Sequence, residues 1–274
     1  MTNGALVLAG GGLAGIAWEV GVLLGIEETA PDAAARLFAP DTVFVGTSAG
    51  SVVASQVAGR VPLQTLFDLQ LLDDPEVGAT FDMASLTAIA EQALAGVASL
   101  EDARKRIGEL ARDRQEGVDR SAVIAARLPV KEWSEHRVLI TAVDAESGAL
   151  RVFDRESGVA LVDAVAASCA VPLIWPTIEI EGRQYMDGGV RSGTNADLAA
   201  GAERVLILSP SGNPIPVAEL ASLSPAPVHV IAADAASLRA FGSNPLDPAV
   251  WAASAAAGRA QGVSVAAHVA EFWA

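Results

Sequence analysis

The chain has 274 residues, of which 51% are hydrophobic but only 5% aromatic, and a formal net charge of −15. This length suits one large α/β domain or two small ones. The acidic balance argues against nucleic acid as a partner, because binding it needs a basic surface, and it disfavours docking on anionic lipid. A neutral lipid or a small neutral ester remains compatible as a ligand.

The sequence shows no sign of membrane insertion or secretion. It has no uncharged apolar run of about 18 residues, so we expect no integral membrane segment, although transient membrane contact is compatible with the composition. The N-terminus lacks a basic region before an apolar one, so we expect no signal peptide. Cys169 is the only cysteine, which makes an intramolecular disulfide impossible and fits a cytoplasmic location; we expect it to be a small buried apolar residue.

Strands alternate with helices along the chain, which predicts a three-layer α/β/α sandwich around a mainly parallel central sheet. Short apolar runs predict strands at 5–9, 42–45, 137–143, 150–153, 177–180, 184–186, 205–208 and 228–232. Helices are expected at 16–28, 48–59, 161–170, 234–241 and 248–274.

The remaining stretches are expected to connect or cover this framework. Residues 31–38 are interpreted as a connection between the first helix and the second strand. Residues 62–135 are rich in charged residues and are predicted to form a helical insertion or cap, with the charges on a solvated face. We therefore expect a single domain over residues 1–274.

The run from Val43 to Gly50 organises the rest, because β-branched and aromatic residues break there into Gly-Thr-Ser-Ala-Gly. This is Gly-x-Ser-x-Gly, typical of a strand that turns sharply into a helix with a serine at the tip. Gly46 and Gly50 are expected where a Cβ would not fit. Ser48 is the candidate nucleophile; the alternative is a chance match to a short pattern.

A glycine cluster, Gly10-Gly11-Gly12 with Gly15, follows the first predicted strand. It also matches the dinucleotide-binding pattern, but the second strand ends without the acidic residue that this pattern expects. Consecutive glycines at a helix N-terminus leave backbone N–H groups free, which suits a developing oxyanion equally well. A purely structural tight turn is the third reading.

Asp187 is the candidate base, because it ends a predicted strand and precedes two glycines, Gly188 and Gly189. The alternative is an ordinary Asp-Gly-Gly turn. A histidine triad is a further alternative, since His229 and His268 follow Asp187. We favour it less, because the first is predicted inside an apolar strand and the second on the terminal helix.

Four motifs in order, at residues 10–15, 46–50, 167–172 and 187–189, resemble those of the patatin-like phospholipases over roughly residues 4 to 210. The resemblance implies a Ser48–Asp187 dyad without histidine and an oxyanion hole of backbone N–H groups. We expect no cofactor, and we expect no metal site because the three histidines are scattered without metal-ligand spacing. The hole would be formed by Gly10, Gly11, Gly12 and Leu13, with Gly15, Gly46, Gly50, Gly188 and Gly189 as motif residues.

Ala14 departs from the family pattern, which commonly has Arg or Lys there; this bears on phospholipid preference more than on hydrolysis. The expected function is a serine acyl-ester hydrolase acting on a lipid or small ester. Two alternatives stay open: an acyltransferase using the same serine, and a catalytically silent binding or regulatory protein. The sequence does not define an oligomeric state.

Overall fold

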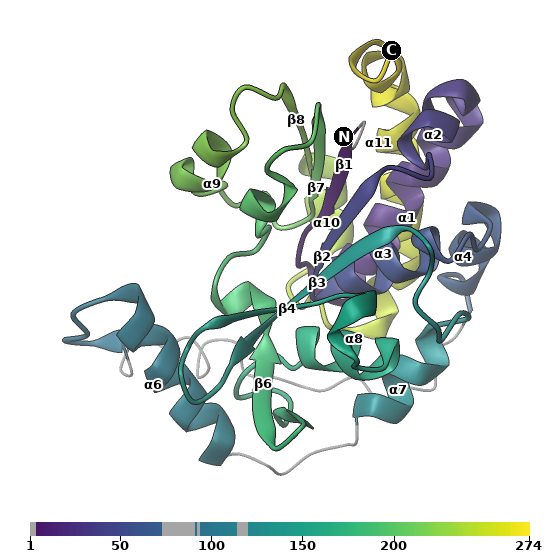
Figure 1. Cartoon of the computed structure of the whole chain (residues 1–274). Helices are drawn as coiled ribbons and strands as arrows, with labels where there is room; N and C mark the ends of the chain where they lie inside the picture. The colour runs from purple at the N-terminus through teal and green to yellow at the C-terminus, as the bar shows by residue number, and fades with distance from the viewer. Residues whose placement is uncertain (1–3, 73–90, 92–93, 114–119) are drawn as a thin grey trace.

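The structure is a computed structural model that describes residues 4–72, 91, 94–113 and 120–274. An eight-stranded sheet has the order β5-β6-β3-β2-β1-β7-β8, with β4 paired to β3 (Figure 1). The strands are β1 Ala5–Leu8, β2 Val43–Thr47, β3 Arg137–Asp144, β4 Leu150–Phe153, β5 Ile178–Ile180, β6 Arg183–Asp187, β7 Val205–Ser209 and β8 Val228–Ala232.

Five strands, β3-β2-β1-β7-β8, run parallel, whereas β4, β5 and β6 form antiparallel pairs at one side. All four residues of β1 are buried. A parallel strand covered on both faces needs apolar side chains at every position, which is why Ala5–Leu8 shows no alternation. The predicted mainly parallel α/β fold is confirmed.

The α-helices are α1 Gly12–Thr29, α2 Pro31–Leu37, α3 Ala49–Ala58, α4 Leu63–Leu69, α6 Leu100–Asp113, α7 Arg120–Arg127, α8 Leu161–Ser168, α9 Val217–Ser222, α10 Ala235–Ala240 and α11 Trp251–Phe272. Even-numbered β1 residues such as Leu6 share a large core with α1, α3, α8 and α11. Odd-numbered ones such as Val7 share a smaller core with Leu223, the residue that follows α9, and with a 3-10 turn at Ala196–Ala199. The two helical layers are therefore unequal in thickness.

Helix α1 is enclosed between the sheet and α11, which explains why it is apolar all round. The two helices cross at glycines: a Cβ at Gly21 would lie 2.3 Å from the Ala255 carbonyl oxygen, and one at Gly258 would lie 2.3 Å from that of Trp18. The C-terminal helix thus fixes α1, the helix that begins at the glycine cluster.

The described part of the expected insertion is helical and consists of α4, α6 and α7. Helix α6 docks on the β3–β4 turn, where Arg104 Nε donates a 2.7 Å hydrogen bond to the Gly148 carbonyl. The pair Glu101–Lys105 lies on its exposed face, as expected of a solvated charge run. Residues 73–90, 92–93 and 114–119 lie outside the described residues, and the single-domain assignment stays a prediction.

Two expectations about α1 and its neighbour were wrong. Residues 31–37 form α2 rather than a connection, because Pro31 occupies the first helical turn, where its missing N–H costs nothing. Helix α1 starts at Gly12, four residues before the predicted start, and so grows directly out of the glycine cluster. Within the described residues, none of the helices has the length and apolarity to cross a bilayer.

Candidate active site

Ser48 stands at the turn from β2 into α3, with φ 52° and ψ −119°. A non-glycine residue at positive φ is strained and persists only where its surroundings hold it. Two close backbone contacts do so here. A Cβ at Gly46 would lie 2.6 Å from Ser51 Cα, and one at Gly50 would lie 2.0 Å from the Leu8 carbonyl oxygen. Both motif glycines are therefore required by sterics, as predicted.

The backbone of Ser48 is held by side chains from α3 and α8. Its N–H donates to Ser168 Oγ at 2.9 Å, and its carbonyl accepts from Ser51 Oγ at 2.6 Å and from Cys169 Sγ at 3.4 Å. Cys169 is 8% exposed, as predicted for a buried apolar residue. The motif at 167–172 thus reaches the nucleophile turn.

Asp187 reaches the same edge through strand register. Strand β3 pairs with β2 up to Thr141, and its pairing with β6 begins at the next residue, Ala142, which lies opposite Asp187. The last residue of β6 therefore lies where β2 stops, next to Ser48. The Asp187 N–H donates to the Ala170 carbonyl at 2.9 Å, so the 167–172 motif contacts both candidate residues.

Asp187 is 4% exposed and Ser48 9% exposed. Burial raises the pKa of Asp187 to about 6, while hydrogen bonding from Ser48 and from the Gly189 N–H acts in the opposite direction. Oδ1 accepts the Gly189 N–H at 2.6 Å. Oδ2 is buried and has no well-aligned hydrogen bond within the described residues, which leaves it available to the serine.

The glycine cluster presents fewer donors than predicted. The Gly10 N–H donates to the Gly193 carbonyl at 2.8 Å, so its inclusion in the oxyanion hole was wrong. Gly11, Gly12 and Leu13 precede or open α1, and their N–H groups have no acceptor among the described residues. Gly12 has φ 65°, a conformation that favours glycine.

The other motif glycines allow close approach between segments. A Cβ at Gly15 would lie 3.3 Å from Ala49 Cβ, so α1 and the nucleophile helix touch at their N-termini. One at Gly188 would lie 2.3 Å from Thr141 Oγ1. One at Gly189 would lie 2.9 Å from Asp187 Oδ1.

The histidines all make their contacts elsewhere. His229 on β8 and His268 on α11 lie against each other, with ring centroids 4.5 Å apart. His136 lies just before β3, at the opposite end of the strand from Asp144, and packs edge-on against Phe44. The geometry therefore gives no support to a triad.

Sequence reasoning missed several polar residues at the site. Asn195, at 0% exposure, links Thr47 and Thr141 through its side-chain amide. Ser168 lay inside a recognised motif, but its bond to Ser48 could not be read from it. The motif serine was the only available signal; nothing in the sequence around Asn195 distinguished it from a turn residue.

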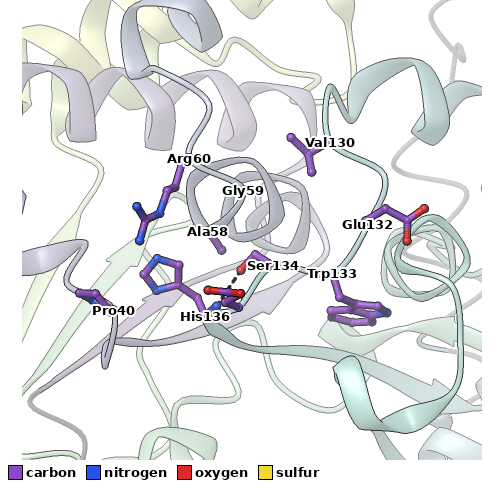
Figure 2. A pocket seen from close by; sticks show the side chains of 10 residues that line it. Pro40, Ala58, Gly59, Arg60, Val130, Glu132, Trp133, Ser134 and His136 are labelled. Carbon is purple, nitrogen blue, oxygen red and sulfur yellow. Dashed lines mark hydrogen bonds between the residues drawn. The ribbon is translucent and has the colours of Figure 1, made fainter.

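A cavity of about 480 Å³ lies at the amino end of the sheet, where β2 and β3 begin. Figure 2 shows Arg60 and His136 close together on one side of it, with Glu132 and Trp133 on the other. Neither Ser48 nor Asp187 is among the described residues that line it. This cavity is separate from the candidate active site.

The fold and this edge define a class: an α/β protein with a strand–serine–helix turn beside a buried aspartate. A family profile described as "Patatin-like phospholipase" matches residues 6–200. The chain therefore belongs to the patatin-like phospholipase family, and membership supports hydrolysis of lipid esters. A search of curated proteins finds no match.

Of the solved structures compared below, VipD supports the same fold. VipD from Legionella pneumophila aligns with a TM-score of 0.51 at 12% identity, over 98% of this chain and 67% of that one. The type III effector ExoU aligns with a TM-score of 0.45 at 19% identity, over 97% of this chain and 53% of that one. The ExoU–SpcU complex from Pseudomonas aeruginosa gives 0.44 at 18%, over 95% and 51%. The chain thus spans two thirds of VipD and about half of ExoU.

Proposed function

We propose that the protein is a serine acyl-ester hydrolase that uses a Ser48–Asp187 dyad. The observation that carries this proposal is the buried Oδ2 of Asp187, which has no well-aligned partner among the described residues while the Ser48 side chain acts on the same carboxylate. A buried acceptor normally has its hydrogen bond, so one left open beside a strained serine is a candidate base.

In the proposed reaction, Ser48 Oγ attacks the ester carbonyl carbon as Asp187 accepts the hydroxyl proton. The carbonyl oxygen becomes an oxyanion held by the N–H groups of Gly11, Gly12 and Leu13. Asp187 then gives the proton to the leaving alkoxide as the ester C–O bond breaks. Water repeats the sequence on the acyl-serine and releases the acid. A pKa of about 6 suits both roles of the carboxyl near neutral pH.

The proposed substrate is a neutral or zwitterionic lipid ester or a small neutral ester. The formal net charge of −15 repels an anionic lipid surface. Ala14, where relatives commonly carry a cation, has its N–H bonded to the Pro245 carbonyl at 2.9 Å and offers no charge to a phosphate.

Ser48→Ala tests the nucleophile, with hydrolysis of a short-chain nitrophenyl ester and labelling by a fluorophosphonate as readouts. We expect both to be lost, by at least about a thousandfold for hydrolysis. Ser55→Ala is the matched control, because this buried serine of the same helix donates only to the Ser51 carbonyl, at 2.7 Å. It should retain both. Wild-type turnover in Ser48→Ala would refute the proposal.

Two further outcomes separate the alternatives. If the wild-type protein is not labelled by the fluorophosphonate, a silent binding protein is favoured over an enzyme. If labelling occurs but an added acceptor alcohol diverts most of the acyl group into a new ester, the acyltransferase reading replaces hydrolysis. Product analysis with and without the alcohol makes this distinction.

A further inference from the structure

A buried polar cluster lies directly beneath the candidate active site and is not used by the proposed chemistry. Its centre is Asn195, which has no exposed surface and a left-handed backbone with φ 49°. Its side-chain Nδ2 lies 2.8 Å from the Ser192 carbonyl and 3.0 Å from Thr47 Oγ1. Longer contacts of 3.3 Å reach Thr141 Oγ1 and the Gly188 carbonyl.

The chemistry of the neighbours fixes the orientation of this amide. Arg191 Nη1 can only donate, and it lies 2.7 Å from Asn195 Oδ1. The carbonyls of Ser192 and Gly188 can only accept, so the nitrogen must face them. The amide therefore has a single satisfied orientation, in which it donates towards the end of β2.

These contacts join the segments that carry the reacting groups. Thr47 immediately precedes Ser48, and Gly188 immediately follows Asp187. Thr141 is the β3 residue at which pairing with β2 ends, and its Oγ1 lies 3.0 Å from Thr47 Oγ1. The Gly193 carbonyl, two residues before Asn195, accepts the Gly10 N–H, which fastens the same loop to the glycine cluster.

The loop around Asn195 is itself held rigidly. Glu219 on α9 is buried, and its Oε2 accepts from Thr194 Oγ1 at 2.7 Å and from the Ala196 N–H at 2.8 Å, one residue to either side of Asn195. Arg191 also makes two hydrogen bonds to Asp197, at 2.9 and 2.7 Å. A firmly held amide can transmit position, whereas a mobile one could not.

We propose that Asn195 is a positioning residue that sets the separation between Ser48 and Asp187 by tying the end of β2 to the loop after β6. It does not touch the reacting atoms; it acts through Thr47, Thr141 and Gly188. The inference rests on the proposed function, since it assumes that these two side chains react together. Misplacing reacting groups by about 1 Å can cost about a hundredfold in rate, so the effect should be large.

Asn195→Gly tests this positioning role, because glycine keeps the left-handed backbone and removes the side-chain amide. We expect kcat for the nitrophenyl ester and the rate of fluorophosphonate labelling to fall about 10- to 100-fold, with KM within about twofold. Gln261→Ala is the matched control. Gln261 is a buried amide on α11, with Nε2 2.7 Å from the Ala232 carbonyl and Oε1 accepting from Trp18 and Ser237. It should lose stability but keep kcat per folded molecule.

A second pair of variants decides the matter if Asn195→Gly does not fold. Thr47→Val removes the hydroxyl that receives the amide while keeping the shape and strand propensity of the residue, and Thr47→Ser keeps the hydroxyl. We expect kcat to fall about tenfold in the first and to return close to the wild-type value in the second.

Equal kcat in Thr47→Val, Thr47→Ser and wild type would overturn the proposal. So would an equal loss of kcat in Gln261→Ala at matched stability. Failure of the proposed function looks different, because Ser48→Ala would then remain active. If only the positioning role of Asn195 is wrong, Ser48→Ala is inactive while Asn195→Gly and Thr47→Val match the wild type.

Discussion

The two ends of the parallel strands show what makes an edge of this sheet a candidate site. The amino end has a cavity of about 480 Å³ whose lining includes the exposed Arg60 and the buried His136. The carboxyl end holds Ser48 and Asp187 almost fully buried, and the backbone N–H of each donates to the distant segment at 168–170. Parallel strands direct their ends and following loops to one edge, so reactive groups from distant segments converge there. This convergence of reactive groups distinguishes the carboxyl end as the candidate site.

The largest expected effect on ester hydrolysis comes from replacing Asp187 at the carboxyl end. Asp187→Asn should lower kcat/KM for a nitrophenyl ester by about 10³- to 10⁴-fold, because an amide cannot accept the serine proton. An Asn195→Gly protein, which keeps the carboxylate, should be less impaired. An Asp187→Asn protein with activity within tenfold of wild type would contradict the assignment of this residue as base.

The same variant should be more stable than the wild type above pH 6. Burial raises the pKa of Asp187 from 3.8 to about 6, so the folded state holds this proton more tightly than the unfolded state. Protonated Asp187 contributes up to about 3 kcal/mol to the free energy of unfolding. This contribution is complete below pH 3.8 and is lost as the pH rises through 6. Urea denaturation at pH 5 and pH 7.5 should show the advantage of Asp187→Asn growing with pH; no growth would contradict the raised pKa.

Helix α3 runs between the two ends of the sheet, and the glycines near its two termini should respond unequally to substitution by alanine. Gly50→Ala at the carboxyl end places a Cβ 2.0 Å from the Leu8 carbonyl oxygen and should cost about 3 kcal/mol or more. Gly59→Ala at the amino end would approach the Ser55 carbonyl oxygen at 3.0 Å and the movable Val130 side chain, and should cost much less. Thermal unfolding of both variants measures the difference, and equal losses would refute the steric argument.

The pH dependence of catalysis should reflect the ionisation of Asp187 at the carboxyl end and not that of His136 at the amino end. Since Asp187 must be ionised to accept a proton, kcat/KM should fall about tenfold per pH unit below an apparent pKa near 6. At the amino end, burial and the positive Arg60 lower the pKa of His136. His136→Gln should therefore leave the profile unchanged, and a shift of the acid limb in this variant would contradict the separation of the two ends.

The smallest effect on hydrolysis is expected from replacing Arg60. Like Ser48, this residue is strained, and it lies just after the C-terminal end of α3. Its φ is 58°, a position after a helix where glycine is preferred. Arg60→Gly should raise the free energy of unfolding by about 1 kcal/mol and leave ester hydrolysis within twofold of wild type. A large loss of activity would show that the amino-end cavity takes part in the reaction.

Local sequence was enough to place the strands and the serine turn. Gly46 and Gly50 stand where a Cβ would not fit, and both positions belong to one strand–turn–helix unit. It could not reveal Asn195, whose partners Thr47 and Thr141 are 148 and 54 residues away. The error at Gly10 has the same origin, since its acceptor lies on the loop after β6. Helix α2 was missed because an alanine-rich segment after a proline is compatible with both a helix and a connection.

By itself, the sequence determined the alternation of strands and helices, the strained turn at Ser48 and the places where a side chain would not fit, since these follow from short-range periodicity and sterics. Only the tertiary structure decided which amide donors of the glycine cluster remain free, how far burial raises the pKa of Asp187, and how Asn195 ties the two halves of the site together. Those properties depend on the register of β6 against β3 and on the docking of the loop that follows it, and no local pattern encodes either.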